Sequence, residues 1–592
     1  MIDTLAQMFL NTIKSFPKPD LMLYKQADEY QPISTKEFED RVVHLSLGLM
    51  ELGLNKGDKL VLLSENCPNW VITDLASLSF GGITVPIYTS LVPEQIKYII
   101  NDSDAKVVVC SDLSLWEKVH SVRDQLNKVE NFIVMEDPAP EGTLSLSEVT
   151  ENGRKKAEKE PDLFEKTVSE IKPDDIASII YTSGTTGTPK GVMLTHSNFM
   201  SNSKATASII EFTSKDTVLS FLPLSHVLER MVTFTYLYKG CSIAYAESVE
   251  TVGENLLEIK PHIMVSVPRV FEKIYAKVMD SVLEGSALKK KLFFWSVRIG
   301  KEYAQRELSH QKISKSLRWK RSIADKLVFS KIVSKTGGRV RFFVSGGAPL
   351  SKDIAEFFYG MGLVVLEGYG LTESSPVIAV NTFENLRFGS VGKPIPDVEV
   401  KIAEDGEILA KGPNIMKGYY KLDEETKEAL RQGWLHTGDI GYLDEDNFLY
   451  ITDRKKDIIV TAGGKNIAPQ MIENQLKTNP FISNVVVLGD KRKFISALVV
   501  PVFEKIKEYA DASNIEYESI TDLVENEKIV NFVMSEVNRY SANLSSYERI
   551  KRIILLDRDF EIEKGELTPS LKVKRNIVED KYKERINKLY QD

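Results

Sequence analysis

The chain has 592 residues, of which 43% are hydrophobic and 27% charged, and its formal net charge is −8. At roughly 100–200 residues per domain this length predicts several structural units, and the apolar content excludes a disordered chain. The negative charge argues against a dedicated nucleic-acid-binding protein, and three cysteines that lie far apart argue against a disulfide framework. We therefore expect a protein of a reducing compartment, the cytoplasm, with no nucleic-acid partner.

The N-terminal segment, residues 1–16, places its apolar side chains at helical spacing. Asp3 stands where a secretory signal peptide needs cations, so we expect an ordinary first helix. The longest uncharged stretch, residues 75–93, contains glycine and proline and is typical of buried strands and turns. We therefore expect no membrane-spanning segment.

The next region alternates helical patterns with short apolar runs. A helical pattern over residues 35–52 precedes an apolar run at 59–64, and a second run follows at 106–110. Strands separated by helices predict α/β layers whose loops gather at the carboxyl ends of the strands.

An apolar run ending at Tyr181 leads directly into residues 182–190, TSGTTGTPK. Glycines let backbone N–H groups approach phosphate oxygens, hydroxyls donate further hydrogen bonds, and a lysine adds positive charge. The Walker pattern is not matched, because Pro189 replaces its second glycine and Gly191 stands where a Ser or Thr would hold Mg²⁺. The segment predicts a phosphate-binding loop of another class; the alternative is a Thr/Gly-rich surface turn.

A basic segment, residues 289–341, contains 16 Lys or Arg and 3 Asp or Glu, a local net charge of +13. It includes the apolar-rich strings LFFWSV and SLRWKR, and such mixtures at helical spacing suit a membrane-surface helix. The alternative is a solvated helical pair with its apolar side on the core. We expect a basic helical insert at about 276–338.

The last third of the chain predicts a β-rich module and a separate small domain. In residues 398–402 and 406–410, apolar and polar side chains alternate, and an Asp-Gly turn joins the two runs. This pattern is typical of paired strands. Beyond the charged run DRKKD, strands and polar helices alternate again over a length normal for a small domain. We therefore expect an N-terminal domain at 1–453, a hinge at 454–456 and a C-terminal domain at 457–592.

The string YTSGTTGTPKGVMLTH resembles the signature of the adenylate-forming superfamily, which includes acyl-CoA synthetases, luciferases and peptide-synthetase adenylation domains. Five further strings occur in that family's order: SGGAP, EGYGLTE, GWLHTGD, YITDRKKD and GGKNIAP. The resemblance covers most of the chain from about Asn66 to Arg575. VPRVFEKIY, residues 267–275, looks specifically like the long-chain acyl-CoA synthetase branch. The implied fold is α/β: a large N-terminal domain of layered α/β subdomains plus a β-rich subdomain, and a small mobile α+β C-terminal domain.

The resemblance implies ATP-dependent activation of a long-chain fatty acid in two half-reactions. A carboxylate attacks the α-phosphorus of ATP and releases pyrophosphate; the thiol of CoA then attacks the acyl-adenylate and expels AMP. Because the first half-reaction brings two anions together, the site must supply positive charge and directed hydrogen bonds. ATP and CoA are therefore expected as co-substrates and Mg²⁺ as the cofactor.

The resemblance also assigns nucleotide-binding roles across these motifs. The phosphates would contact a run of hydroxyl, glycine and lysine residues: Thr182, Ser183, Gly184, Thr185, Thr186, Gly187, Thr188 and Lys190. Adenine would lie against Tyr369, over the backbone of Gly346, Gly347 and Ala348, with Gly368, Gly370 and Thr372 in the same motif as Tyr369. Asp439 would accept the ribose hydroxyls and Arg454 would contact ribose or phosphate. Glu373 and Thr185 would hold Mg²⁺. The alternatives are a turn residue for Asp439 and a solvated glutamate for Glu373.

Two further residues are expected to act on the reacting groups. His226 matches the family position beside the carboxylate and the path of the thiol; the alternative is a core histidine. Some long-chain enzymes carry an aromatic gate four residues later, where this chain has Arg230. Lys572 aligns with the essential lysine of the family, although Leu571 replaces the usual preceding glycine, and Lys574 is the second choice.

Members of the family rotate the C-terminal domain between the two half-reactions. Lys456 matches the hinge position, and Gly463 and Gly464 would let the pantetheine arm of CoA pass close to the backbone.

Three competing interpretations stay open: a fatty acyl-AMP ligase that loads a carrier protein, a CoA ligase for another carboxylic acid, and a non-catalytic AMP-binding sensor. The third would be expected to have lost Glu373, Asp439 or Lys572, all of which are present. Peripheral membrane contact through residues 289–341 and a homodimer also stay open, as does the preferred acyl chain length.

Overall fold

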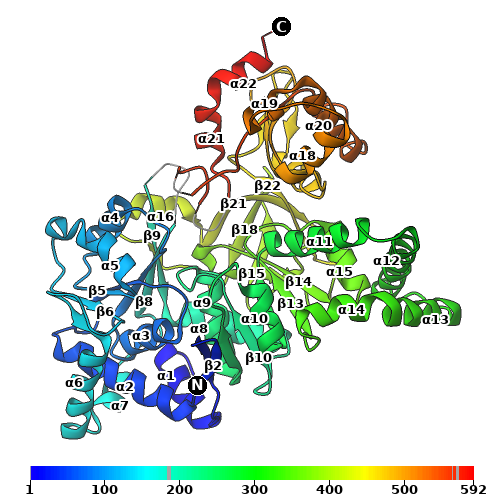
Figure 1. Cartoon of the computed structure of the whole chain (residues 1–592). Helices are drawn as coiled ribbons and strands as arrows, with labels where there is room; N and C mark the ends of the chain where they lie inside the picture. The colour runs from blue at the N-terminus through cyan, green and yellow to red at the C-terminus, as the bar shows by residue number, and fades with distance from the viewer. Residues whose placement is uncertain (1, 183–187, 563, 569–571, 592) are drawn as a thin grey trace.

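The computed structural model describes residues 2–182, 188–562, 564–568 and 572–591. A large N-terminal body carries a smaller C-terminal body, and the chain ends at the far side of the smaller one (Figure 1). The predicted α/β class with a large and a small domain is confirmed. Within the described residues, no helix combines the length and the apolar composition needed to cross a bilayer.

The first large sheet is mostly parallel and places the predicted adenine motifs side by side. Its strands follow in the spatial order β16 (Lys393–Pro394), β15 (Val377–Val380), β14 (Val364–Gly370), β13 (Phe342–Ser345), β12 (Ile263–Ser266), β10 (Thr217–Ser220), β11 (Ser242–Tyr245), β1 (Met22–Gln26) and β2 (Glu29–Ile33). Since β13 and β14 are parallel neighbours, with Ser345 opposite Glu367, the loops that follow them leave the sheet at the same edge.

The second large sheet carries the predicted phosphate loop. Its order is β19 (Gly418–Tyr419), β9 (Lys190–Thr195), β8 (Ile176–Thr182), β4 (Ile83–Ile87), β3 (Lys59–Leu63), β5 (Val107–Cys110), β6 (Asn131–Val134) and β7 (Leu144–Ser145). The predicted strands at 59–64 and 106–110 are confirmed as β3 and β5, which are parallel and buried. Strands β8 and β9 are antiparallel, so the loop between them forms the tip of a hairpin.

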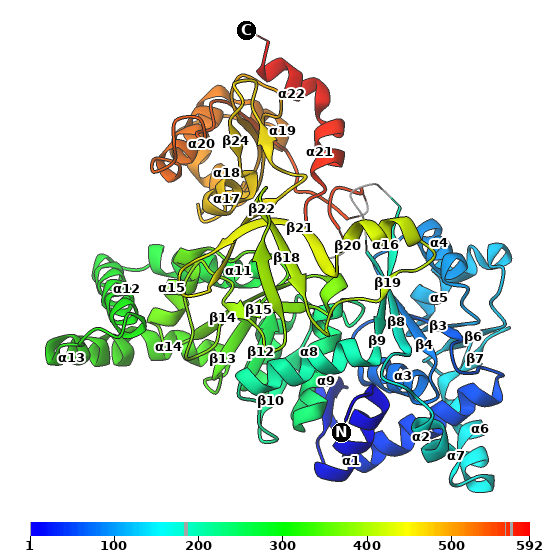
Figure 2. The ribbon, with the colours of Figure 1, turned by 180° about the vertical axis from the view of Figure 1, so that it is seen from behind.

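Helices surround both sheets (Figures 1 and 2), and most of them share one large apolar core, whereas the helices at 93–103 and 113–120 pack in a second core against the second sheet. The predicted first helix is confirmed as α1, whose N-terminus is capped by Thr4 and Gln7 in a reciprocal capping box. These helices are α1 (Leu5–Ser15), α2 (Thr35–Glu51), α3 (Pro68–Ser79), α4 (Pro93–Ser103), α5 (Leu113–His120), α6 (Leu146–Lys159), α7 (Leu163–Ser169), α8 (His196–Ile209), α9 (Val227–Lys239), α10 (Val252–Ile259) and α15 (Lys352–Gly360).

The basic insert is helical, as predicted, and projects from one side of the N-terminal body (Figure 1). It consists of α11 (Pro268–Leu283), α12 (Ala287–Leu308), α13 (Lys315–Ala324) and α14 (Ser330–Val333). Helix α12 packs on α15 through two glycines, because a Cβ at Gly300 would lie 2.5 Å from the carbonyl oxygen of Gly360. One side of the insert is therefore anchored to the core.

The predicted β-rich module and the small domain follow. The module consists of β17 (Glu399–Ile402), β18 (Glu407–Lys411), β20 (Leu430–Arg431), β21 (Trp434–Leu443) and β22 (Leu449–Arg454), with α16 (Asp423–Ala429). The C-terminal body has the strands β23 (Ile459–Val460), β24 (Asn466–Ile467), β25 (Ile482–Leu488), β26 (Ser496–Pro501) and β27 (Ile553–Leu555). Its helices are α17 (Pro469–Leu476), α18 (Phe503–Ala512), α19 (Ile520–Glu525), α20 (Glu527–Tyr540), α21 (Arg575–Lys581) and α22 (Lys583–Leu589). It has its own apolar core between β25–β27 and these helices.

Candidate active site

Asp439 is the centre of a hydrogen-bonded group formed by three strands. It lies on β21 opposite Arg454 of β22, and the two form an ion pair with 3.0 Å between Arg454 Nε and Asp439 Oδ1. The hydroxyl of Tyr369, at the end of β14, donates to Oδ2 of Asp439 at 2.7 Å. Burial and the charge of Asp439 raise the pKa of Tyr369 well above its usual value, so the hydroxyl stays a donor. Each oxygen of Asp439 keeps a further lone pair for a hydroxyl ligand.

The loop after β13 contains one position, Gly347, whose backbone conformation favours glycine. A Cβ at Gly346 would lie 2.9 Å from Cδ2 of Leu228 in α9, and Gly347 has a φ of +81°, which favours glycine. In the neighbouring motif, a Cβ at Gly370 would lie 1.7 Å from the carbonyl oxygen of Pro376. Close backbone packing therefore requires glycine at 370; Gly368 and Thr372 belong to the same motif, and Ala348 follows Gly347 in the chain.

Glu373 lies beside the ends of the hairpin that carries the predicted phosphate loop. The hydroxyl of Tyr419 in β19 donates to Oε1 of Glu373 at 2.9 Å, and Nζ of Lys190 lies 5.3 Å from the centre of the Tyr419 ring. Thr182 pairs with Lys190 across the hairpin, and Thr188 precedes Lys190. The predicted phosphate ligands Ser183, Gly184, Thr185, Thr186 and Gly187 lie outside the described residues.

The sequence interpretation missed Tyr419. Its only signal is the string GYY at 418–420, which by itself is unremarkable. Strand β19 joins the edge of the second sheet, where Tyr419 is opposite Val192, and this pairing brings the tyrosine to Glu373. Burial and the charge of Glu373 raise the pKa of Tyr419, so its hydroxyl remains a donor to the carboxylate.

His226 caps the N-terminus of α9 and is half-buried. Its Nδ1 accepts a hydrogen bond from the backbone N–H of Leu228 at 3.2 Å, so the neutral ring carries its proton on Nε2. Burial, followed by the positive charge of Lys572, lowers the pKa of His226 to about 4. The ring is therefore neutral at pH 7 and Nε2–H is a hydrogen-bond donor.

One turn further along α9, Arg230 points into the core. It is fully buried and donates from Nε to Oδ2 of Asp74 at 2.9 Å, and it also donates to the hydroxyl of Ser178 in β8. Its guanidinium packs against the rings of three aromatic residues, Trp70, Phe199 and Phe234. The position where some long-chain enzymes have an aromatic gate is thus occupied by a structural ion pair.

Lys572 reaches this group from the C-terminal body. Its backbone N–H bonds to Oγ1 of Thr568 at 3.0 Å, and Val573 pairs with Leu567, so it lies on one arm of a short hairpin. The positive charge of Lys572 lowers the pKa of His226, and the charges of Arg454 and Asp439 act in turn on the pKa of Lys572, so the four side chains interact electrostatically. Burial of the ammonium, followed by the charge of Arg454, lowers the pKa of Lys572 to about 8, although the residue retains solvent access. The second choice, Lys574, lies at the start of α21, where its N–H bonds to the carbonyl oxygen of Glu566 at 2.7 Å.

The predicted CoA-binding glycines lie elsewhere. Gly463 and Gly464 form an exposed turn between β23 and β24, Gly464 has a φ of +72°, and a side chain there would meet no atom within 4 Å. Lys456, the predicted hinge residue, lies between β22 and β23 and is exposed. Among the described residues, Tyr369, Asp439 and Arg454 form one group, and Glu373 with Tyr419 lies beside Lys190, whereas Gly463 and Gly464 form an exposed turn of the C-terminal body.

The residues present fit a Mg²⁺ ion bound mainly through phosphates. Within the described residues, no three His, Cys, Asp or Glu side chains form a group that could hold a metal by themselves. Glu373 offers one half-buried carboxylate whose Oε1 is oriented by Tyr419, and Mg²⁺ is commonly bound by one or two carboxylates together with substrate phosphates and water.

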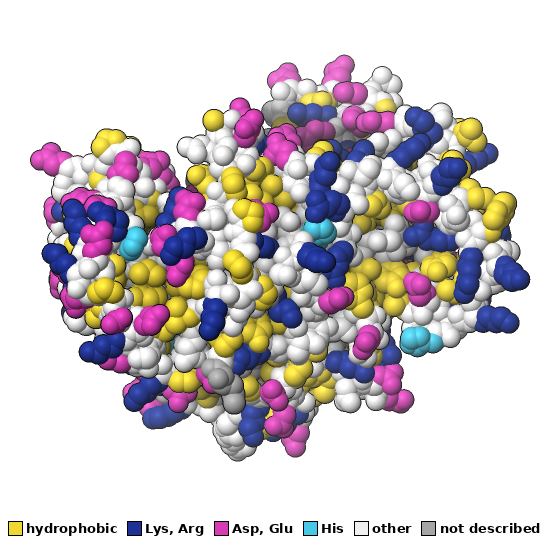
Figure 3. All heavy atoms as spheres, turned by 90° about the horizontal axis from the view of Figure 1, so that it is seen from below, with side chains coloured by type: hydrophobic (Ala, Val, Ile, Leu, Met, Phe, Trp, Pro, Cys, Tyr) yellow, Lys and Arg dark blue, Asp and Glu magenta, His cyan; other side chains and the backbone are white. Residues whose placement is uncertain are grey.

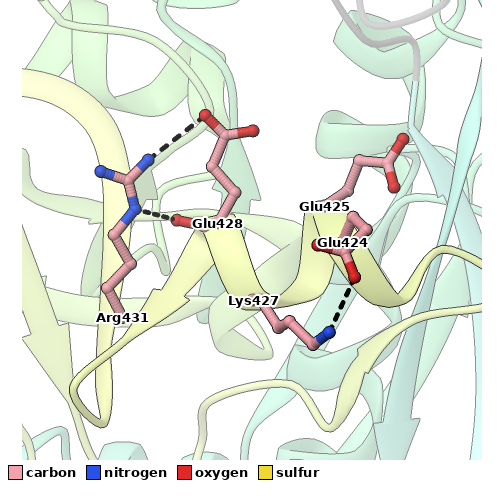
Figure 4. Close-up of a pocket in the computed structure, with 5 residues that line it drawn as sticks. All are labelled: Glu424, Glu425, Lys427, Glu428 and Arg431. Atoms are coloured by element: carbon pink, nitrogen blue, oxygen red, sulfur yellow. Dashed lines mark hydrogen bonds and ion pairs between the residues drawn. The ribbon is translucent and has the colours of Figure 1, made fainter.

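A surface hollow of about 650 Å³ lies over α16 (Figure 4). It is lined by Glu424, Glu425, Lys427, Glu428 and Arg431, and these side chains pair with one another, Lys427 with Glu424 at 2.7 Å and Arg431 with Glu428 at 3.2 Å. Because this lining is wholly charged, the hollow does not suit a fatty acyl chain.

Comparisons with known proteins identify the family of the two bodies. A family model described as "AMP-binding enzyme" matches residues 12–420, and one described as "AMP-binding enzyme C-terminal domain" matches residues 456–592. "Long-chain-fatty-acid--CoA ligase FadD15" of Mycobacterium tuberculosis is 34% identical over 97% of this chain and 95% of its own length. "Long chain acyl-CoA synthetase 7, peroxisomal" of Arabidopsis thaliana is 35% identical over 95% of this chain and 82% of its own.

Solved structures share the fold. The anthranilate CoA ligase AuaEII in complex with anthranoyl-AMP superimposes with a TM-score of 0.73 at 18% identity, covering 99% of this chain and 98% of its own. A fatty acyl CoA synthetase of Mycobacterium tuberculosis gives a TM-score of 0.63 at 22% identity, covering 98% and 99%. At these identities the likeness concerns the fold alone.

Proposed function

Since the chain belongs to the AMP-binding enzyme family, and within it to the long-chain acyl-CoA synthetases, we propose that it activates a long-chain fatty acid with ATP and transfers the acyl group to CoA. One observation carries the proposal. Lys572 of the C-terminal body interacts electrostatically with His226 and with the Asp439–Arg454 pair of the N-terminal body. This arrangement supports adenylation, which needs a cation at the junction of two anions.

The nucleotide would be bound mainly by the N-terminal body. Asp439 would accept the ribose hydroxyls with its remaining lone pairs while Tyr369 and Arg454 hold it in place. Lys190 and the hydroxyl-rich loop before it would bind the β- and γ-phosphates. Glu373, oriented by Tyr419, would hold Mg²⁺, which when bound supplies charge neutralisation for the phosphates.

In the first half-reaction an oxygen of the fatty acid carboxylate forms a bond to the α-phosphorus, and the bond from that phosphorus to the pyrophosphate oxygen breaks. The ammonium of Lys572 would contact both the carboxylate and the α-phosphate, which lowers their repulsion and stabilises the charge that develops in the transition state. The neutral ring of His226 would orient the carboxylate by donating from Nε2.

In the second half-reaction the sulfur of CoA forms a bond to the acyl carbon, and AMP leaves. We propose that the C-terminal body rotates about Lys456 for this step and brings the turn of Gly463 and Gly464 to the site. The exposure of this turn, and the room at Gly464 for a chain passing close to the backbone, support that assignment.

The test is AMP release by the purified protein with ATP, Mg²⁺ and palmitate, in the presence and absence of CoA, with benzoate as the comparison acid. Palmitoyl-CoA and a stoichiometric amount of AMP are expected only when palmitate and CoA are both present. Adenylate without CoA-thioester would favour the acyl-AMP ligase, and activity with benzoate instead of palmitate would favour another acid. No turnover of any acid would favour the AMP sensor.

We further propose that the basic insert contacts an anionic membrane surface. Leu288 and Trp319 are 77% and 66% exposed and lie among the lysines and arginines of α12 and α13. Figure 3 includes this end of the molecule, where Lys and Arg side chains alternate with hydrophobic ones. Exposed apolar side chains within a positive field suit a surface of anionic lipids.

A further inference from the structure

Helix α11, the first helix of the basic insert, connects the nucleotide site with the rest of the insert. It begins directly after β12 with VPRVFEKIY, the string that resembles the long-chain branch. Phe271 is fully buried and packs edge-on against Phe343 and Phe358, with ring centres 5.7 Å apart in both pairs. At the start of the helix, Cγ1 of Val267 lies 3.8 Å from the position that a Cβ on Gly347 would occupy. The base of α11 is therefore fixed in the N-terminal core, next to the predicted adenine loop.

The opposite side of α11 contacts the C-terminal body at two points. Arg269 donates from Nη1 to the carbonyl oxygen of Ser483 at 3.0 Å and from Nη2 to its hydroxyl at 3.2 Å. Three helical turns further on, Asp280 forms an ion pair with Lys505 of α18. Figures 1 and 2 both show α11 directly beneath the body that carries α18.

The first of these contacts is supported from within the C-terminal body. The hydroxyl of Ser483 in β25 donates to Oδ2 of Asp559 at 3.0 Å, and Nδ2 of Asn484 donates to the other oxygen of Asp559 at 2.7 Å. Ser483, which accepts the hydrogen bonds from Arg269, is therefore held in place by Asp559 of the same domain.

These contacts belong to the same domain arrangement that brings Lys572 to His226. Ser483 and Lys505 are parts of the packed body around β25–β27, and Lys572 reaches the site from that same body. A rotation that removes Lys572 from the site must therefore also separate Ser483 from Arg269 and Lys505 from Asp280. Contacts that exist in only one of two arrangements shift the equilibrium toward that arrangement.

We propose that Arg269, Asp280 and Lys505 are positioning residues that hold the C-terminal domain in the arrangement for adenylation. The inference rests on the proposed two-step function and adds to it which residues favour the first step. It also gives the string VPRVFEKIY a role: its buried face fixes α11 to the core and its arginine holds the moving domain.

The solvent exposure of the Asp280–Lys505 pair sets the expected size of the change in adenylation rate. The side chains of Asp280 and Lys505 are 41% and 20% exposed, so water screens part of their attraction. Reversing one charge removes the attraction and adds repulsion. We expect this to lower the rate of adenylation about threefold to tenfold, the range for a partly exposed pair whose sign is reversed.

The experiment measures the two half-reactions separately in the full-length protein. Adenylation is followed as palmitate-dependent exchange of pyrophosphate into ATP, and thioester formation is followed from supplied palmitoyl-adenylate and CoA. The variants are Asp280→Lys, Lys505→Asp, their combination and Arg269→Ala. Lys507→Asp, an exposed position on the same helix, is the matched control.

Exchange activity should fall about threefold to tenfold in the single variants at 280 and 505 and should also fall in Arg269→Ala, whereas each of these variants should keep thioester formation within about twofold. The control should keep both activities. The combination of Asp280→Lys with Lys505→Asp should restore exchange, because the pair is re-formed with opposite signs. Unchanged exchange in the single variants, a parallel loss of both half-reactions, or no rescue in the combination would overturn the inference. A wild-type protein without exchange activity toward any fatty acid would instead defeat the proposed function.

Discussion

Lys572 combines partial solvent access with a lowered pKa. Burial of its ammonium and the nearby charge of Arg454 lower its pKa from 10.5 to about 8. The lysine therefore carries its full charge below pH 8 and loses it as the pH rises through that value. An unperturbed lysine would keep its charge for about two further pH units.

We predict that kcat/KM for ATP in adenylation falls at alkaline pH with an apparent pKa of about 8, since this quantity reports ionisations of the free enzyme. Lys572→Ala should lose adenylation by about 100-fold or more at every pH, as expected for removal of a charge that stabilises the transition state. Pyrophosphate exchange between pH 6.5 and 9.5 measures both effects.

Two matched variants identify the responsible lysine. Lys572→Arg keeps its positive charge throughout, so any activity that it retains should lack the alkaline decline. Lys574→Ala should adenylate as fast as the wild type. Lys572→Ala should still form the thioester from supplied acyl-adenylate. If Lys574→Ala abolishes adenylation and Lys572→Ala does not, the assignment moves to Lys574.

At the scale of elements, Arg230 joins three parts of the N-terminal body. It belongs to α9, whose first residue follows His226, and it contacts Asp74 of α3 and Ser178 of β8, the strand that leads to the phosphate loop. The side chains of Arg230 and Asp74 are fully buried, so removing one partner leaves a charge in the core without its counter-ion.

We predict that Asp74→Ala lowers the free energy of unfolding by about 3–5 kcal/mol, whereas Glu428→Ala, which breaks the exposed pair with Arg431, costs less than about 1 kcal/mol. Replacing both buried partners, with Asp74→Leu and Arg230→Met, should recover much of the loss, because no charge then remains in the core. Urea unfolding of the variants measures these differences. Equal costs for Asp74→Ala and Glu428→Ala would contradict the structural role of the pair.

The basic insert has one side on the core and another side exposed to solvent. Its apolar residues Phe293, Ile299 and Leu317 are buried, as expected for a helical pair resting on the core, while Trp319 and Leu288 are exposed. Helical spacing predicted the helices, but which side would be covered depended on where α15 lies. Only the fold shows which side of the insert is buried against the core and which is exposed.

At the scale of the whole molecule, the +13 segment projects from a protein of net charge −8. We predict that the protein co-sediments with liposomes containing anionic lipids at low salt and is released as salt is raised, because screening shortens the range of the attraction. Liposomes of neutral lipid provide the control for apolar binding alone.

The exposed lysines at the start of α12 offer a variant for the same experiment. Changing Lys289 and Lys291 to Glu should weaken binding, whereas Lys427→Glu on α16 makes the same kind of charge change in a different part of the molecule. Binding that is absent, or indifferent to salt and to the insert variant, would contradict membrane contact through this segment.

The sequence by itself determined the α/β class, the strands β3 and β5, the first helix and the helical insert, and it proposed the candidate site residues. These depend on local properties: the alternation of apolar residues, the spacing of glycines and hydroxyls, and strings of a few adjacent residues. Such patterns can be recognised without knowing which residues contact one another in the fold.

Only the tertiary structure decided which residues meet. Tyr419 reaches Glu373 because β19 pairs with β9, and Arg230 is enclosed because α9 packs against α3 and β8. The pKa of Lys572 is lowered because its ammonium is desolvated near Arg454. Each of these pairs joins residues that are far apart in the chain. Their distances, burial and electrostatics come from packing between elements, which no local pattern encodes.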